Sequence, residues 1–202
     1  MYACHWLYFI GTGMKVTKAQ AQANRAHIVE TASTLFRERG YDGVSVADLM
    51  AAAGFTHGGF YKHFRSKADL MSEAAACGFA QMEASTGEAE RATLIERYLS
   101  REHRDAPGDG CTLAALSADA ARQPEEIKAV FAQGMERLLA KATSTEPDAD
   151  EFAQQTARAE RINALAHLVG ALMLSRACPD DSALADEILK SCRVHALARV
   201  EG

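Results

Sequence analysis

The spacing of apolar residues predicts a short helix in the first third of the chain. Between Val46 and Ala53 the apolar side chains fall at positions i, i+3, i+4 and i+7, which places them on one face of a helix. Ser45 comes directly before this stripe and Asp48 follows three residues later, an arrangement typical of an acidic N-terminal capping box. Gly54 follows the stripe and suits the left-handed conformation that ends many helices.

A second short helix is predicted to begin after Thr56, which we expect to act as its N-cap. Three apolar residues are expected on its buried side: Phe60, Tyr61 and Phe64. Ser66 and Asp69 form a third predicted cap, at the start of a longer helix. Two short helices joined by a tight glycine-containing turn predict a helix-turn-helix, a motif whose second helix enters the major groove of DNA.

The remainder of the chain shows helical periodicity and no alternating apolar run, so no strand is predicted. No apolar stretch reaches the ~18 residues expected of a membrane span, which predicts a soluble protein. The fold class is therefore predicted to be all-α, with about nine helices. Besides the two short helices, helices are predicted over residues 22–39, 67–83, 88–101, 111–122, 124–144, 149–177 and 182–199.

Two adjacent glycines, Gly58 and Gly59, occupy the second short helix. Each glycine costs a helix about 1 kcal/mol relative to alanine. A helix that carries both is expected to need close approach between its backbone and another molecule, and a DNA backbone or base edge would meet that need. The alternative is a glycine-rich turn in an ordinary helical hairpin.

The distribution of charge favours a nucleic-acid-binding N-terminal third. The whole chain has a net charge of −5, which alone argues against such a partner. Residues 15–67, however, contain eight basic and four acidic residues, so this third is basic and the rest of the chain is acidic. A basic end on an acidic body places the phosphate-facing surface at one end of the molecule.

Residues 28–71 resemble the DNA-binding domain of the tetracycline-repressor (TetR-type) family of bacterial transcription regulators. The residues that carry the resemblance are Ala32, Leu35, Phe36, Gly40-Tyr41, Ser45-Val46, Ala53-Gly54-Phe55, Phe60-Tyr61-Lys62-His63-Phe64, Ser66-Lys67 and Leu70. The family usually has Ser or Lys where Thr56 and His57 stand, and commonly one glycine where this chain has two. These departures leave the base preference open.

The resemblance implies a division of roles among the residues of the helix-turn-helix. We expect base-edge contacts from Thr56, His57 and Lys62, with Gly58 and Gly59 permitting close approach. We expect phosphate contacts, which hold register without reading sequence, from Ser45, Tyr61, His63 and Lys67.

The resemblance also implies three parts of the chain: an N-terminal extension (1–17), a three-helix DNA-binding domain (18–66), and a C-terminal helical ligand-binding and dimerisation bundle (67–202). The last two helices are the expected interface of a homodimer, which predicts a palindromic operator in double-stranded DNA. The same apolar faces could instead complete the core of one protomer. For the pocket of an unknown small-molecule effector, the candidate residues are Phe79, Met82, Tyr98, Phe131, Met135 and His167, although residues of this kind are more often core.

One of the five cysteines, Cys111, follows a glycine at a predicted helix N-terminus. The helix dipole there lowers the pKa of a thiol, so Cys111 is a candidate redox- or electrophile-sensing residue. The alternative is a small buried residue in a tight helix start. The odd number of cysteines, without metal-like spacing, suits a reducing cytoplasm and predicts no metal site.

An enzymatic function is not expected. The chain has no catalytic Ser/His/Asp set, no phosphate-binding glycine loop and no zinc-binding HExxH motif, and no catalytic residue or cofactor is predicted. The predicted function is a cytoplasmic, sequence-specific transcriptional regulator. We expect a repressor that a small-molecule inducer releases from DNA, with a thiol-reactive compound as one option. The alternative is a helical ligand-binding or scaffold protein without specific DNA binding.

Overall fold

The computed structural model describes residues 17–86, 89–141 and 151–201, and in these ranges every regular element is helical, which confirms the predicted all-α class. No helix in these ranges is both long and apolar enough to cross a bilayer. The expected N-terminal extension lies, apart from Thr17, outside the described residues. The elements are α1 (Lys18–Arg39), α2 (Val46–Ala52), the 3-10 helix η1 (His57–Lys62), α3 (Lys67–Thr86), α4 (Arg91–Tyr98), α5 (Arg101–Asp105), the 3-10 helix η2 (Pro107–Asp109), α6 (Thr112–Ala120), α7 (Glu125–Lys141), α8 (Glu151–Arg176) and α9 (Ala183–Glu201).

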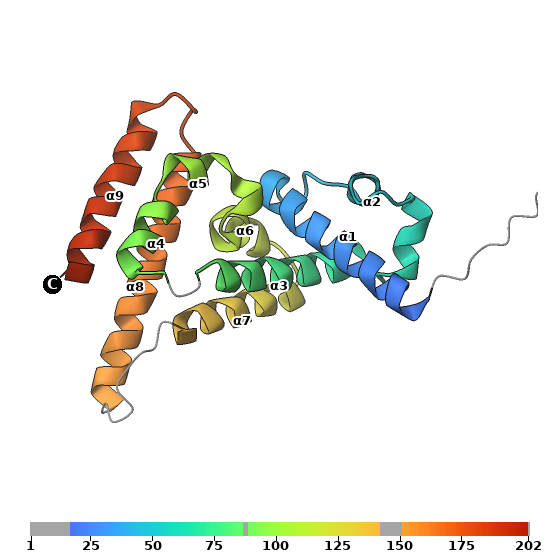
Figure 1. Ribbon diagram of the computed structural model, residues 1–202, viewed down its shortest axis with the longest axis horizontal. Coiled ribbons are helices and arrows are strands. Elements are labelled where there is room, and N and C mark those ends of the chain that lie inside the picture. The colour runs from blue at the N-terminus through green and yellow to red at the C-terminus, as the bar shows by residue number, and fades with distance from the viewer. Residues whose placement is uncertain (1–16, 87–88, 142–150, 202) are drawn as a thin grey trace, which may run out of the picture.

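The molecule is elongated, with the short N-terminal helices at one end and the paired helices α8 and α9 at the other (Figure 1). Helix α3 connects the two ends, because it packs against α1 on one side and α7 on the other. Helices α4 to α6 fill the space between α3 and the α8–α9 pair.

The N-terminal end contains a small, fully enclosed core. Its largest members, all inaccessible to solvent, are Ile28, Phe36, Tyr41, Leu49, Met50 and Phe60. Helix α1 contributes one stripe, α2 contributes another, and η1 contributes a single aromatic ring. The hydrophobic pattern therefore predicted which face of each element is buried, with Tyr61 as the exception described below.

The predicted helix ends at this core are confirmed. The Ser45 hydroxyl accepts a hydrogen bond from the Asp48 N–H (3.2 Å) while the Asp48 carboxylate accepts one from the Ser45 N–H (3.0 Å), which is a complete capping box. The Ser66 hydroxyl caps α3 by accepting from the Asp69 N–H (3.1 Å). Gly54, with φ of +79°, adopts the left-handed conformation expected after α2.

Two local predictions were wrong. Thr56 makes no capping hydrogen bond with its side chain, and the segment that follows is a 3-10 helix rather than an α-helix, consistent with the two glycines in its first turn. The helix expected over 88–101 is divided into α4 and α5. Ser100 causes the division, because its hydroxyl accepts a hydrogen bond from the His103 N–H (3.1 Å) and so starts a new helix.

Candidate DNA-binding surface and effector cavity

The 3-10 helix η1 is anchored to the N-terminal core by one aromatic residue. The Phe60 ring is fully buried and lies 5.4 Å from the Phe64 ring, between centroids. Tyr61 packs edge-on against Phe60 at 5.2 Å, yet 69% of it is exposed. The prediction that Tyr61 belongs to the buried side was wrong, because adjacent residues of a helix with three residues per turn point about 120° apart.

The outer surface of this anchored segment is polar and open to solvent at one end of the molecule. Thr56, His57, Gly58 and Lys62 are exposed, as is Tyr61, and no hydrogen bond engages the side chains of His57, Tyr61 or Lys62 in the described part of the chain. A Cβ atom placed on Gly58 would meet nothing within 4 Å, so packing within the protein does not require glycine there. Gly59, by contrast, is partly buried, and a Cβ atom placed on it would lie 3.6 Å from Cε of Met50. The predicted base-contacting residues Thr56, His57 and Lys62 are thus all accessible to solvent on this segment.

The four predicted phosphate-contacting residues are not equivalent. The Ser45 hydroxyl is occupied by Asp48, to which it donates a hydrogen bond of 2.6 Å, and these bonds lower the pKa of the Asp48 carboxyl. The Lys67 ammonium group donates to the carbonyl of Tyr41 and is partly buried. His63 is half-buried at the end of η1. Tyr61 is therefore the member of this set that is both exposed and without a side-chain hydrogen bond among the described residues.

An arginine that sequence inspection missed fixes the C-terminal end of η1. The Arg25 Nε donates to the carbonyl of His63 (3.3 Å), its two terminal nitrogens pair with both carboxylate oxygens of Glu73, and its guanidinium lies 4.7 Å from the centroid of the Phe64 ring. Arg25 belongs to α1 and Glu73 to α3. The pair therefore ties η1 to both helices, and the 48-residue separation of its members explains why no local pattern indicated it.

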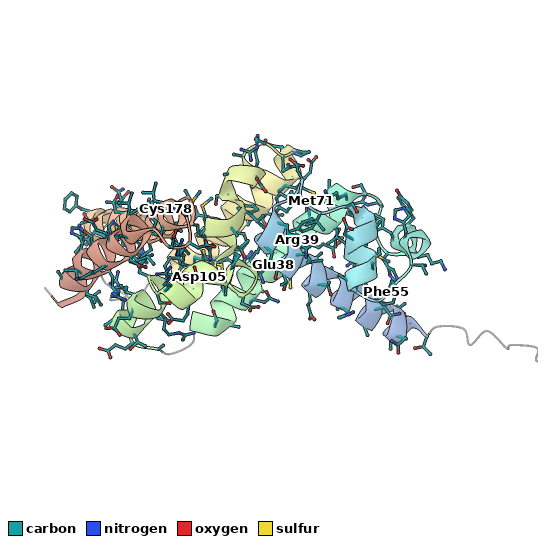
Figure 2. All side chains as sticks on the ribbon, turned by 90° about the horizontal axis from the view of Figure 1, so that it is seen from above. Glu38, Arg39, Phe55, Met71, Asp105 and Cys178 are labelled. Carbon is teal, nitrogen blue, oxygen red and sulfur yellow. The ribbon has the colours of Figure 1, made fainter. Side chains whose placement is uncertain are left out.

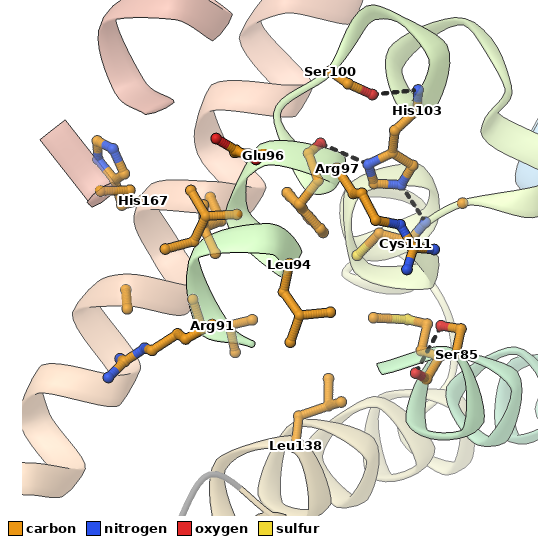
Figure 3. Close-up of a pocket in the computed structure, with 18 of the residues that line it drawn as sticks. Ser85, Arg91, Leu94, Glu96, Arg97, Ser100, His103, Cys111, Leu138 and His167 are labelled. Atoms are coloured by element: carbon orange, nitrogen blue, oxygen red, sulfur yellow. Dashed lines mark hydrogen bonds between the residues drawn. The ribbon is translucent and has the colours of Figure 1, made fainter. Parts of the chain in front are cut away.

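A cavity of about 1640 Å³ lies between α3, α4, α7 and the α8–α9 pair (Figure 3). Three of the predicted pocket residues, Met82, Tyr98 and His167, line it. The other three do not. Phe79 and Phe131 pack edge to face at 5.4 Å within the core, where Phe79 lies against the backbone of residue 134, and Met135 is at the surface. Helical spacing places all six on apolar faces and does not distinguish a face that meets another helix from one that borders a cavity.

One corner of the cavity contains Cys111 and His103. The Cys111 N–H donates to Nε2 of His103 (3.1 Å), and Nδ1 of the same ring lies 2.7 Å from the carbonyl of Tyr98, so Nδ1 carries the hydrogen in this arrangement. The Cys111 thiol is 3% exposed, and burial raises its pKa although neighbouring hydrogen bonds offset part of the effect. The lowered thiol pKa expected at this helix N-terminus was therefore wrong, because loss of hydration outweighs the helix dipole.

Two polar contacts join the cavity region to the N-terminal core. Arg37, a buried residue of α1, lines the cavity and donates from Nε to the carbonyl of Gly108 in η2 (2.7 Å). At the other end of α6, the Asp119 carboxylate accepts a hydrogen bond from the N–H of Tyr41 (2.9 Å). Gly40 makes room for this carboxylate, since a Cβ atom there would lie 2.5 Å from it. Displacement of η2 or α6 would therefore move α1.

The α8–α9 pair has apolar side chains on its outer surface. The most exposed are Phe152, Leu174, Leu184 and Val194, each more than half accessible. Within the pair, Nε2 of His167 lies 3.1 Å from the carbonyl of Cys192.

Among the described residues, no group of three or more His, Cys, Asp or Glu side chains is arranged to hold a metal ion.

Residues 28–74 match the family model described as bacterial regulatory proteins of the tetR family. The HTH-type transcriptional regulator AcrR of Shigella flexneri is 44% identical over 57 residues, which are 28% of this chain and 26% of AcrR. The HTH-type transcriptional repressor DhaR of Mycobacterium sp. (strain GP1) is 51% identical over 43 residues, 21% of this chain and 22% of DhaR. The matched segment thus spans only about a quarter of these relatives' length.

Similarity of fold extends over nearly the whole chain. The reduced form of NemR from E. coli superimposes with a TM-score of 0.64 at 19% identity, over 86% of this chain and 95% of NemR. A TetR-family transcriptional regulator from Cytophaga hutchinsonii gives a TM-score of 0.65 at 19% identity, over 89% and 96% of the two chains. At this identity the comparison establishes a common fold for the C-terminal bundle.

Proposed function

We propose that this chain, which belongs through its N-terminal residues to the tetR family of bacterial regulatory proteins, is a homodimeric repressor of transcription that a small-molecule effector releases from DNA. The DNA-binding part of this function rests on residues 28–74, where the family match lies. Release by an effector, dimerisation and a location with the chromosome in the cytoplasm are proposed from the cavity, the exposed face of α8 and α9, and the family as a whole.

The exposed face of η1 is the observation that supports DNA binding most strongly. A polar, basic and largely unpaired set of side chains stands on a segment whose one buried ring, Phe60, fixes it to a closed core. Presenting this face to DNA costs the free protein little free energy, because no internal hydrogen bond of its side chains has to break. The major groove of DNA admits a helix of this kind.

Within this face the residues take different roles. Thr56, His57 and Lys62 contact base edges, and Gly58 lets the backbone approach the groove without a side chain intervening. Tyr61 donates its hydroxyl hydrogen to a phosphate. We assign Ser45, His63 and Lys67 a supporting role, in which capping and internal hydrogen bonds hold α2, η1 and the start of α3 in register against the DNA backbone.

A second copy of the chain covers the exposed apolar side chains of α8 and α9. Four helices, two from each protomer, would then bury Leu174, Leu184 and Val194 in one isologous interface. Two-fold symmetry places two recognition segments on one face of the DNA and predicts an inverted repeat with half-sites separated by whole helical turns. Leu174→Asp is expected to give a monomer in sedimentation experiments and to lose most of the operator affinity.

The polar contacts of Arg37 and Asp119 supply a route for effector action. A ligand in the cavity that favours a different position of η2 or α6 moves α1 and separates the two recognition segments from their half-sites. The size of this effect is bounded by the ligand's difference in affinity for the two arrangements.

The roles on the recognition face can be tested with two variants on a panel of duplexes, each carrying one substitution in the preferred site. Tyr61→Phe is expected to weaken binding to every duplex by the same factor, because a phosphate contact carries no sequence information. His57→Ala is expected to lose discrimination at one base position and to leave the others unchanged. Identical profiles for the two variants would contradict the assignment.

A further inference from the structure

The cavity is bordered by buried positive charge that the protein does not neutralise. Arg37 donates only to neutral acceptors: the carbonyl of Gly108, the Ser33 hydroxyl (2.6 Å) and the Gln81 side-chain carbonyl (3.1 Å). Among the described residues no carboxylate forms an ion pair with it. A guanidinium that is 6% exposed and forms no ion pair is expensive to bury, and burial lowers its pKa although the charges of Asp109 and Glu38 act in the opposite direction.

A second guanidinium, that of Arg176, lies next to the backbone of His103. Arg176 donates from Nε to the carbonyl of Arg104 (2.9 Å) and from Nη2 to the carbonyl of His103 (2.7 Å), while its Nη1 is buried without a hydrogen-bond partner. It too forms no ion pair with a carboxylate within the described ranges. Burial lowers its pKa, and the nearby charge of Asp105 offsets only part of that effect.

A third guanidinium, that of Arg97, points from α4 toward Cys111 and His103 (Figure 3). No ion pair or hydrogen bond engages its side chain in the part of the chain that the structure describes. The same positive charges act on His103. Burial lowers the pKa of its imidazole, and the hydrogen bond to the carbonyl of Tyr98 raises it. The charges of Arg176 and Arg97 lower this pKa further. His103 therefore stays neutral and does not repel an anion.

The same corner contains a buried hydroxyl group, and the carboxylates of the cavity are solvated. The Tyr98 hydroxyl, which is buried, has no hydrogen-bond partner in the described ranges other than its interaction with the Cys111 thiol. The cavity-lining carboxylates are all exposed to solvent, where water screens them: Glu96, Glu102, Asp109 and Glu160. The buried charge that lines the cavity is therefore positive, whereas its carboxylates are all solvated.

Apolar side chains line the adjoining wall of the cavity. Leu94 of α4 and Leu138 of α7 point toward one another (Figure 3), and Met82 of α3 also lines the cavity. A ligand that fits both regions has an apolar body and a charged head. An organic cation would be repelled by the guanidinium groups of Arg37 and Arg97, which line the cavity, whereas an anion would supply a counter-charge.

We propose that the cavity binds an amphipathic organic anion, with its apolar body between Met82, Leu94 and Leu138 and its carboxylate-type head beside Arg97 at the Gly110–Cys111 corner. This proposal rests on the proposed function only in calling the ligand an effector. Binding of the anion to the cavity is a property of the protein without DNA.

The test uses three probes that share one aromatic body and differ in the head group: 1-naphthaleneacetate, 2-(1-naphthyl)ethanol and 2-(1-naphthyl)ethylamine. Calorimetric titration of the intact protein, without DNA, is expected to give an affinity for the acetate at least about tenfold above that for the alcohol, since a charge-assisted hydrogen bond replaces a neutral one. The amine is expected to bind more weakly than the alcohol. Equal or tighter binding of the amine, or failure of all three to bind at millimolar concentration, would overturn the proposal.

A matched pair of variants locates the head group. Arg97→Gln removes the guanidinium at the Cys111 corner, and Arg91→Gln removes one that also lines the cavity but points toward α8 (Figure 3). Both arginines are exposed, so both variants should unfold at the same temperature as the wild-type protein. Arg97→Gln is expected to abolish the preference for the acetate over the alcohol, and Arg91→Gln to retain it. The proposal is wrong if Arg97→Gln keeps the full preference.

DNA release is measured separately on the wild-type protein, using the same acetate probe and a fluorescent operator duplex. Binding of the probe with release of the operator supports both the anion site and the proposed effector role. Binding without release supports the anion site and contradicts that role. The two claims can thus fail independently.

Discussion

The two ends of this molecule enclose their side chains to different degrees. At the N-terminal end, where Phe55 lies (Figure 2), Phe36, Tyr41, Leu49 and Phe60 are fully inaccessible to solvent. At the other end, a cavity of about 1640 Å³ separates α4 from α8, and α8 and α9 keep large apolar side chains at the surface. A closed core fixes the geometry of a recognition surface, whereas an open bundle leaves space for a ligand and a face for a second protomer.

The same contrast is present in the similarities to other proteins. The N-terminal segment is 44% identical to the matching part of AcrR, while similarity over the C-terminal bundle is evident from fold alone, at 19% identity to NemR. A recognition unit that must fit one partner of fixed shape tolerates few packings. A bundle around a cavity keeps its helices with many different linings.

Truncating one apolar side chain at each end should show the difference in packing most clearly. Phe60→Ala is expected to lower the free energy of unfolding by roughly 3–5 kcal/mol, because it leaves a cavity in a closed core, and to abolish DNA binding. Leu94→Ala only enlarges an existing cavity and should cost about 1 kcal/mol. Urea-induced unfolding of both variants measures the difference. Similar losses of stability in the two variants would show that the two ends are packed equally tightly.

A backbone substitution tests how firmly the turn of the helix-turn-helix is set. Gly54→Ala is expected to cost roughly 1–2 kcal/mol of stability, since its φ of +79° strains any residue with a side chain. A Cβ atom there would contact nothing within 4 Å, so the cost is conformational and not steric. Gly170→Ala in α8 is the matched control, because it also has free space but lies in a helix, and should be neutral or stabilising.

A substitution at the recognition face should separate stability from function. Gly58→Ala meets no atom and has no positive φ, so the free protein should gain roughly 0.4–1 kcal/mol of stability. Its affinity for DNA is nevertheless expected to fall by about tenfold, since the new methyl group stands where the backbone approaches the groove, a loss of about 1.4 kcal/mol. Titration of a fluorescent operator measures the affinity, and unchanged binding would remove Gly58 from the interface.

The smallest expected effect concerns pH and the bundle. The pKa of His103 is lowered from its ordinary value of 6.5, so the unfolded chain binds this proton more tightly than the folded one. Stability is therefore full above pH of about 6.5 and falls, by up to about 1 kcal/mol per pH unit, as the pH drops from there toward the lowered value. Thermal unfolding between pH 5 and 8 should show this slope, and His103→Gln should reduce it. A variant with the wild-type slope would assign the dependence to another group.

Local chemistry accounts for what the sequence could predict. The capping box of Ser45, the cap at Ser66 and the left-handed Gly54 each depend on residues within four positions of one another, and all three are present as predicted. The apolar stripes also identified the buried faces of α1 and α2.

The errors arose where distant residues or loss of hydration decide the outcome. The Arg25–Glu73 pair joins positions 48 residues apart, and the core contact of Phe79 with Phe131 depends on the path of two helices. Cys111 stands at a helix N-terminus as expected, but only the tertiary structure reveals that burial controls its pKa. The positive corner of the cavity likewise depends on arginines from α1, α4 and α8, which no single stretch of sequence brings together.

The central claim, that the closed N-terminal end presents a sequence-reading surface, is tested most directly by selection of bound DNA from a random pool. The intact protein is used at near-physiological salt, where non-specific phosphate contacts are weakened. The account predicts enrichment of a single inverted repeat bound at least ~10³-fold more tightly than random DNA. Recovery of no sequence above background would contradict it and would favour a helical ligand-binding protein without specific DNA binding.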